Sequence, residues 1–326
     1  MRSIPLRPLL LRGEIKRCKA QLVHHQPSPR FNNLSVSEWL VRGLAKRGVA
    51  AVLMETRQVR AALSSMRTKS DRNDARGMAH LLRMGWFRPV HLKAADTREH
   101  RTRLAARDAL VRRVRDLENS ILLRGYGLRV PLKTRGGWDR AIRGLIEGHL
   151  GLTGIFEPLL LARAALHEQL AVLDKQVRET ARTDPICKRL MAAPGVGAIV
   201  ALTFRCAVDD PRRFTSSRSI GAFFGLTPRR YQSSETDRVG GISRAGDPAA
   251  RAALFEAAHV IMTRVAKWSA LKSWAVRVVQ RRGAKRGKVA LARKLAVVLH
   301  RMFAASRTSA APLLATTSSP RTSSQA

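Results

Sequence analysis

The chain has 326 residues, of which 61 are Lys or Arg and 23 are Asp or Glu, so its formal net charge is +38. Arginine supplies 48 of the cations, and apolar residues make up 45% of the chain. An apolar share of this size is typical of packed domains, which excludes a disordered basic tail and a disulfide-stapled mini-protein. From the length we expect about two domains.

The excess of positive charge predicts a polyanionic partner. Arginine favours nucleic acid over a membrane surface, because the planar guanidinium binds phosphate through paired hydrogen bonds. The cations are spread along the chain, which indicates an extended binding surface. The three cysteines, Cys18, Cys187 and Cys206, form no close pair, so we expect reduced, buried thiols.

The first elements indicate an α/β unit. Prolines break any period in residues 1–35, but a helix is predicted over 37–48, followed by a short buried strand over 49–54. Alternation of this kind is typical of the edge of an α/β unit. Residues 57–84 are predicted to be mostly helical.

Two long helices follow, one over 98–123 and one after Pro158, with a loop near 125–138 between them. In each helix apolar residues step by four, three and four positions, the spacing of a heptad seam. The seam residues are Leu110, Val114, Leu117 and Ile121 in the first helix and Leu166, Leu170, Leu173 and Val177 in the second. The spacing leaves open whether the helices form an antiparallel hairpin or zip to another subunit.

The sequence becomes more apolar from Asp184, where RLMAAPGVGAIVALTF predicts a helix, a tight turn and a second helix. TPRRYQSSETDRVGGISRAGD predicts a long cationic loop, and Asp247-Pro248 predicts the cap of a helix that runs through Met262. Residues 281–303 predict a basic loop and then a helix. Residues 304–326 contain ten Ser or Thr and predict a disordered tail.

Asp71 and Asp74 lie three residues apart in KSDRNDA and would share a helix face. Adjacent carboxylates repel each other, so a hard divalent ion such as Mg²⁺ is their natural occupant. Lys69 and Arg72 are candidate contacts to a nucleic-acid backbone. The alternative is a solvated helix start, where the helix dipole favours acidic residues.

Gly195 and Gly197 lie in a Pro-Gly-Val-Gly turn between the two apolar helices. Glycines let the backbone approach a phosphate, and the next helix presents free N–H groups, as in a helix-hairpin-helix grip on DNA. A plain helix–helix turn is the alternative.

The cationic loop contains Ser233 and Ser234. A serine among arginines could attack a phosphodiester, because the cations would stabilise the developing negative charge. The loop has no histidine to act as a base, and binding of phosphate without covalent chemistry is the alternative. The arginines of the loop are Arg229, Arg230, Arg238 and Arg244.

Together these segments resemble the insertion-sequence 110/1111 transposase family, whose members join an N-terminal RuvC-like DEDD domain to a serine-bearing transposase domain and are guided by a bridge RNA. KSDRNDARGMAHLLRMGWFRPVH resembles the end of the first domain. MAAPGVGAIVALTF, DDPRRFTSSRSIGAFFGLTPRRYQSSETDRVGGISRAGD and ALFEAAHVIM resemble the second domain in order and spacing. The likeness covers residues 37–302.

The resemblance implies a partial RuvC-like α/β domain of the RNase H type at 1–95, with 1–35 degenerate. It implies a helical coiled-coil linker at 96–183, and a mainly α transposase domain with a helix-hairpin-helix-like element at 184–303. A disordered tail at 304–326 completes the expected organisation.

The resemblance also implies a chemistry. Asp71 and Asp74 match the last two of the family's four acids, which hold Mg²⁺, and Ser233 matches the serine that forms a phosphoserine link to DNA. The family usually has Gly where this chain has Ser234, so Ser234 remains an alternative nucleophile. The implied partners are DNA (element ends and target), a structured guide RNA and further copies of the chain in a dimer or tetramer. We expect no membrane partner, and a place in the bacterial cytoplasm at the nucleoid.

The N-terminus departs from the family pattern, which begins with a strand carrying the first acid. Residues 1–31 contain no Asp, and Asn32 and Asn33 stand where the second acid is usual. Glu14, Glu38 and Glu55 fit neither position. We therefore expect a decayed or mis-started gene copy that is inactive as it stands.

The predicted function is transposition of an insertion sequence by Mg²⁺-assisted attack of a serine on a DNA phosphodiester. Two alternatives remain open. One is a non-catalytic nucleic-acid-binding protein, and the other is a RuvC-type metal nuclease without serine chemistry.

Overall fold

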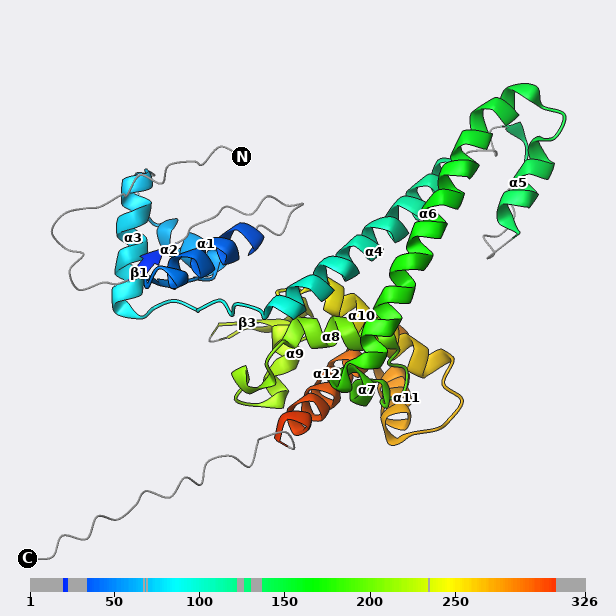
Figure 1. The fold of residues 1–326 in the computed structure, drawn as a ribbon. Coiled ribbons are helices and arrows are strands. Elements are labelled where there is room, and N and C mark those ends of the chain that lie inside the picture. The colour runs from blue at the N-terminus through cyan, green and yellow to red at the C-terminus, as the bar shows by residue number, and fades with distance from the viewer. Residues whose placement is uncertain are drawn as a thin grey trace, which may run out of the picture. The chain divides into compact units, whose positions relative to one another are not determined.

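The computed structural model describes residues 20–22, 34–66, 68, 70–121, 126–129, 137–233 and 235–308. The described chain is mainly helical and divides into two compact units, Met1–Lys93 and Ala94–Ala326 (Figure 1). The three-part division expected from the sequence stays a prediction. Among the predicted residues, Cys18, Lys69 and Ser234 lie outside the described residues, as does 309–326 of the expected tail.

The first unit contains a short β-α-β segment. Its elements are β1 (Ala20–Leu22), α1 (Leu34–Lys46), β2 (Ala50–Val52), α2 (Thr56–Leu63) and α3 (Asp71–Met84). β1 pairs with β2 in parallel, with Ala20 opposite Ala50, and α1 connects them. The helix predicted over 37–48 is confirmed, and the strand predicted over 49–54 is present as β2 but is exposed to half-buried rather than buried. A RuvC-like fold for this unit stays a prediction.

The prediction that residues 57–84 are mostly helical is confirmed, although the chain leaves the helix between α2 and α3. The hydroxyls of Ser64 and Ser65 donate to the carbonyls of Ala61 and Ala62, at 2.7 and 3.0 Å, which satisfies groups at the end of α2. The Ser70 side chain then accepts from the backbone N–H of Asn73 and caps α3.

The second unit is built from nine α-helices, two 3₁₀ turns and a β-hairpin among its described residues. The elements are α4 (Ala95–Ser120), α5 (Trp138–Ile146), α6 (Leu150–Thr183), α7 (Pro185–Met191), α8 (Ala198–Val208), η2 (Pro211–Arg213), η3 (Ser217–Ser219), α9 (Ile220–Phe223), β3 (Pro228–Gln232), β4 (Asp237–Ile242), α10 (Pro248–Thr263), α11 (Ala270–Arg282) and α12 (Ala284–Thr308).

Helices α4 and α6 form an antiparallel hairpin within the chain (Figure 1). Val114 and Val177 of the predicted seams are buried, Val177 as part of the main core. Arg107 donates to Asp174 at 2.5 Å, and Arg163 donates to Glu118 at 2.8 Å, which fixes the antiparallel register. The structure thus contains the hairpin, one of the two pairings that the heptad spacing left open.

Helix α6 begins at Leu150, so the prediction that it starts after Pro158 is wrong. Proline lacks a backbone N–H and disfavours a helix interior. Here the burial of Leu152, Phe156 and Leu160 in a cluster with α5 outweighs that cost. Tertiary packing therefore extends the helix through the proline.

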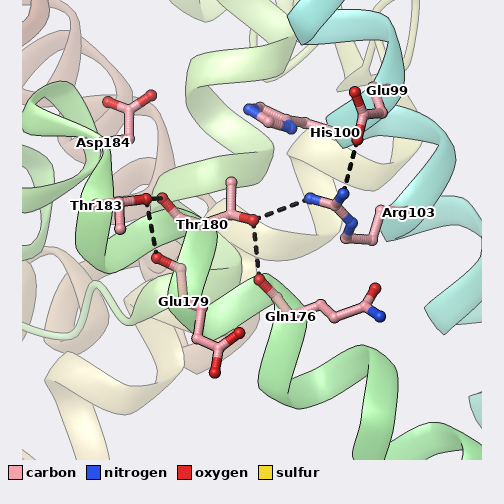
Figure 2. A pocket seen from close by; sticks show the side chains of 8 residues that line it. All are labelled: Glu99, His100, Arg103, Gln176, Glu179, Thr180, Thr183 and Asp184. Atoms are coloured by element: carbon pink, nitrogen blue, oxygen red, sulfur yellow. Dashed lines mark hydrogen bonds and ion pairs between the residues drawn. The ribbon is translucent and has the colours of Figure 1, made fainter.

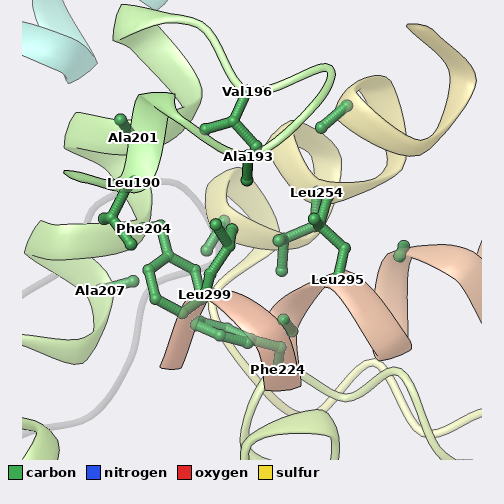
Figure 3. Close-up of a cluster of buried hydrophobic side chains, with 14 of the residues drawn as sticks. Leu190, Ala193, Val196, Ala201, Phe204, Ala207, Phe224, Leu254, Leu295 and Leu299 are labelled. Carbon is green, nitrogen blue, oxygen red and sulfur yellow. The ribbon is translucent and has the colours of Figure 1, made fainter. Parts of the chain in front are cut away.

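The main core of the second unit lies among α7, α8, α9, α10 and α12 (Figure 3). Phe204, Phe224 and Leu299 are at most 1% exposed within it. Cys187 and Cys206 are also buried and carry reduced thiols, as predicted. Burial raises the pKa of the Cys187 thiol, so it is held in the neutral form.

The second unit tests three further predictions. Asp247 caps α10 as predicted, since its carboxylate accepts from the N–H groups of Ala249 and Ala250. The basic loop predicted from residue 281 is wrong, because Gly283 alone separates α11 from α12. Helix α12 continues to Thr308, so residues 304–308 are helical rather than part of a disordered tail.

No helix in the described part of the chain is long and apolar enough to cross a bilayer.

Candidate functional site

The two carboxylates predicted to hold Mg²⁺ lie in the first unit, in the first turn of α3. Asp71 is exposed and Asp74 is half-buried, and Arg72 between them is exposed. The dipole of α3 favours negative charge at this end. Within the residues that the structure describes, no group of three or more His, Cys, Asp or Glu side chains could hold a metal ion.

Ser233 lies in the second unit, at the tip of the β3–β4 hairpin. The long loop predicted for this segment is therefore wrong, because it folds back into two antiparallel strands. The backbone N–H of Ser233 donates to the Thr236 carbonyl at 2.9 Å, which closes the turn. Ser233 is exposed, so its hydroxyl is accessible to a macromolecular substrate.

Three of the four predicted arginines, Arg229, Arg230 and Arg238, lie on the exposed strands of the hairpin. Tyr231 pairs with Arg238 in the strand register, and Arg230 pairs with Val239. Arg229 donates to the Ser243 carbonyl at 3.2 Å and so lies along the base of the hairpin. Arg244 lies just beyond the end of β4 and has a positive φ of 54°.

Arg230 is already neutralised by a carboxylate that the sequence reasoning missed. Its guanidinium donates two hydrogen bonds to Asp237, at 2.8 and 2.7 Å. The hydrogen bond from Arg230 holds the pKa of Asp237 below its ordinary value. The sequence signal for this pair is an opposite charge seven residues away across a turn, which becomes visible only once a hairpin is assumed.

Two glycines allow the base of the hairpin to pack closely against α9. Gly225 has φ +66°, and a Cβ on it would lie 2.5 Å from the Ala245 backbone nitrogen. A Cβ on Gly246 would collide with the Phe223 carbonyl oxygen. Side chains at either position would separate the two chain segments, so these glycines position the hairpin on the core.

The structure accounts for Gly195 without a phosphate. This glycine has φ +74°, and a Cβ would lie 2.6 Å from Ile261 and 2.8 Å from the Ala257 carbonyl oxygen of α10. Gly195 is therefore required for close helix packing. Gly197 precedes α8, and nothing lies within 4 Å of the position that its Cβ would take. Backbone binding to DNA at this turn stays a prediction.

A cavity of about 530 Å³ lies between α4 and α6, and none of the predicted site residues lines it (Figure 2). Arg103 spans it by donating to Glu99 at 2.8 Å and to the Thr180 hydroxyl at 2.9 Å. His100 and Glu179 also line it. Because Arg103 is hydrogen-bonded to residues of α4 and α6, it joins the two helices. The cavity is therefore not a second candidate site for phosphate chemistry.

The sequence is similar to known transposases. Residues 187–275 match the pattern of the Transposase IS116/IS110/IS902 family. The transposase for insertion sequence element IS1111A of Coxiella burnetii is 30% identical over 259 residues, which cover 77% of this chain and 71% of that protein. A putative transposase of Sinorhizobium fredii, y4pF/y4sB, is 29% identical over 73% of this chain and 63% of its own length. A probable family 20 transposase of Pseudomonas aeruginosa is 29% identical over 71% of each chain.

Proposed function

Because the chain belongs to the IS116/IS110/IS902 family of transposases, we propose that it recombines the DNA of an insertion sequence with the Ser233 hydroxyl as nucleophile. The observation that carries this proposal is the exposed position of Ser233 at the tip of a hairpin whose strands bear three arginines, with Arg244 just beyond β4. A hydroxyl at a protruding tip can reach a phosphodiester within duplex DNA. The nearby cations would stabilise the negative charge that develops on the phosphate.

The proposed step exchanges one phosphate ester for another. The Ser233 Oγ forms a bond to phosphorus while the bond between phosphorus and one DNA oxygen breaks. The serine proton passes to water, and the departing DNA oxygen takes up a proton to become a hydroxyl. A second DNA hydroxyl can later attack the phosphoserine and release Ser233. The number of phosphate ester bonds is unchanged, so no external energy source is required.

Asp71 and Asp74 are proposed to hold Mg²⁺. Their donor type fits, because one or two carboxylates with phosphate oxygens and water suffice for this ion. When bound, Mg²⁺ would neutralise charge on the phosphate oxygens. The role of the two aspartates is to present adjacent carboxylates on the first turn of α3. A RuvC-like fold for the unit that contains them is part of the same proposal.

The proposed partners are the DNA of the element ends and target, a structured guide RNA and further copies of the chain in a dimer or tetramer. The proposed location is the bacterial nucleoid. The net charge of +38 supports a nucleic-acid partner, since an isolated fold with this charge repels itself.

A second candidate function is binding of nucleic acid without catalysis by a decayed copy. One observation favours it: the described residues place only two carboxylates at the proposed metal position, where the family has four acids. A RuvC-type nuclease without serine chemistry is the third candidate.

The three candidates differ in what they do to labelled element-end DNA in the presence of Mg²⁺ and the flanking RNA. Serine chemistry predicts a protein–DNA adduct that survives denaturation and is lost in Ser233→Ala and Asp71→Ala. A RuvC-type nuclease predicts cleavage without an adduct, retained in Ser233→Ala and lost in Asp71→Ala. A binder predicts a salt-sensitive complex with neither adduct nor cleavage.

A further inference from the structure

The corner between α11 and α12 concentrates positive charge. From residue 248 to residue 308 the sequence has 14 Lys or Arg and a single carboxylate, Glu256. Two of these cations precede Gly283 and two follow it, and all four side chains are exposed. They are Arg281, Arg282, Lys285 and Arg286, and we call them the basic corner.

Two glycines hold the basic corner together. Gly283 has φ +81°, a conformation that glycine adopts without strain, and it turns the chain directly from α11 into α12. Gly287 packs against Val279 so closely that a Cβ would collide with its side chain and lie 3.2 Å from its Cα. The crossing helices therefore keep the four cations within a small area.

The charge of the basic corner is not balanced inside the protein. None of its four residues lies in an ion pair with a carboxylate of the described chain, whereas Arg107, Arg163 and Arg205 of the same unit are each paired. Lys285 and Arg286 also lie in the first turn of α12, where the helix dipole disfavours cations. This repulsion opposes folding and would be relieved by an anionic partner.

We propose that the basic corner binds the phosphate backbone of duplex DNA, at a position separate from the β3–β4 hairpin. This inference depends on the proposed transposase function only because it takes DNA as the partner. Contacts to phosphate oxygens position DNA but carry no sequence information, so the proposed contact is expected with a duplex of any sequence.

The test measures binding of a duplex of unrelated sequence by the full chain carrying Ser233→Ala, so that serine chemistry does not enter. The corner variant replaces Arg281, Arg282, Lys285 and Arg286 with Gln. A matched control replaces four exposed cations of the α4–α6 hairpin with Gln, which lowers the net charge equally. The control residues are Arg113, Arg115, Lys175 and Arg182.

We expect the corner variant to bind about tenfold or more weakly near 100 mM salt. The slope of log K against log salt should become shallower by about 3 to 4, because each phosphate contact contributes about 0.9. The control variant should change both quantities much less. Equal losses in the two variants, or no loss in the corner variant, would overturn the proposal. A loss seen with duplex RNA but not with duplex DNA would overturn the assignment to DNA.

A second measurement uses the unsubstituted chain and so does not depend on how the variants fold. Duplex DNA should protect Lys285 from acetylation by an amine-reactive reagent, while Lys175 on α6 continues to react. Equal labelling of Lys285 with and without DNA would contradict the proposal. Failure of the serine chemistry would leave both binding results unaffected, so the two proposals can fail separately.

Discussion

Arg230 and Asp237 face each other across the hairpin that presents Ser233, joined by two hydrogen bonds of 2.8 and 2.7 Å. The two residues bracket the turn of which Ser233 and Thr236 form the closing backbone pair. An exposed ion pair contributes little to stability on its own. The pair is diagonal, because Asp237 lies opposite Gln232 at the last paired step of the strands and Arg230 lies opposite Val239. It lowers the net charge next to the proposed nucleophile.

Because of this ion pair, we expect Arg230 and Arg238 to contribute unequally to DNA affinity. Arg238→Gln should weaken binding of duplex DNA more than Arg230→Gln, because the charge of Arg230 is already balanced by Asp237. Titrations at several salt concentrations measure this, and the Arg238 variant should lose about one unit of salt slope. Larger losses in the Arg230 variant would show that its partner in the complex is phosphate instead of Asp237.

The glycines at the base of the hairpin provide a packing prediction. Gly225→Ala should destabilise the second unit by about 2–4 kcal/mol, since it combines a positive φ with a collision against backbone atoms. Gly241→Ala is the control, because nothing lies within 4 Å of its Cβ position, and it should stay within about 0.5 kcal/mol of the parent. Denaturant unfolding measures both. Similar stabilities for the two variants would contradict the close approach of α9 and the hairpin.

The tip of the α4–α6 hairpin depends on Arg163, a charged side chain that is only 8% exposed. It donates to Glu118 and Asp139 and lies over the Trp138 ring at 4.7 Å. Arg163→Ala should cost about 3–5 kcal/mol, because it removes the guanidinium that pairs with two partly buried carboxylates. Arg163→Lys should not restore the loss, since lysine cannot donate to both acids in a fork.

Thermal unfolding followed by far-ultraviolet circular dichroism measures this effect. Arg143→Ala serves as the control, because the Arg143–Glu157 pair is exposed and should leave the melting temperature unchanged. An equal effect of the two substitutions would mean that the buried network does not hold the hairpin tip.

Asp247 links acid sensitivity to the ion pair that joins Arg101 of α4 to the start of α10. Burial opposes ionisation of its carboxyl, but the charge and hydrogen bond of Arg101 at 2.7 Å outweigh it, so the pKa is lowered. A lowered folded-state pKa stabilises the fold above the unfolded value of about 3.9, and this contribution is lost as the pH falls below it. Asp247→Ala should therefore cost about 1–2 kcal/mol at pH 7, including the lost cap.

The cost of Asp247→Ala should shrink as the pH falls below about 4, because the parent chain then loses the same interaction. Asp108→Ala removes an exposed pair with Arg112 and should cost no more than about 0.5 kcal/mol at either pH. Denaturant unfolding at pH 7 and in acid measures both variants. A cost for Asp247→Ala that does not depend on pH would exclude the ion pair as its cause.

The sequence predicts those elements whose signals are local. The cap of α10 follows from Asp247-Pro248, and the pairing positions of α4 and α6 follow from heptad spacing, because both depend on residues close together in the chain. The helix through Pro158 could not be predicted, since it depends on burial of Phe156 and Leu160 against α5. The β3–β4 hairpin gives no alternating apolar signal, because nearly all of its residues are exposed.

The candidate site is predictable in its residues but not in its geometry. Sequence motifs select Asp71, Asp74 and Ser233, and the structure places the acids on a helix start and the serine at a hairpin tip. The pairing of Arg230 with Asp237 depends on a strand register that no local pattern specifies. The packing role of Gly195 likewise depends on α10, which lies more than 50 residues further along the chain.

The central claim is that the Ser233 hydroxyl becomes bonded to DNA phosphate, and mass mapping of the adduct tests it most directly. The full chain is incubated with element-end DNA, Mg²⁺ and the flanking RNA, and the denatured product is digested with nuclease and protease. The account predicts a nucleotide phosphate on the peptide that spans the hairpin, with fragment ions that place it on Ser233. A phosphate on Ser234 or on any other residue, or cleaved DNA with every peptide unmodified, would contradict it.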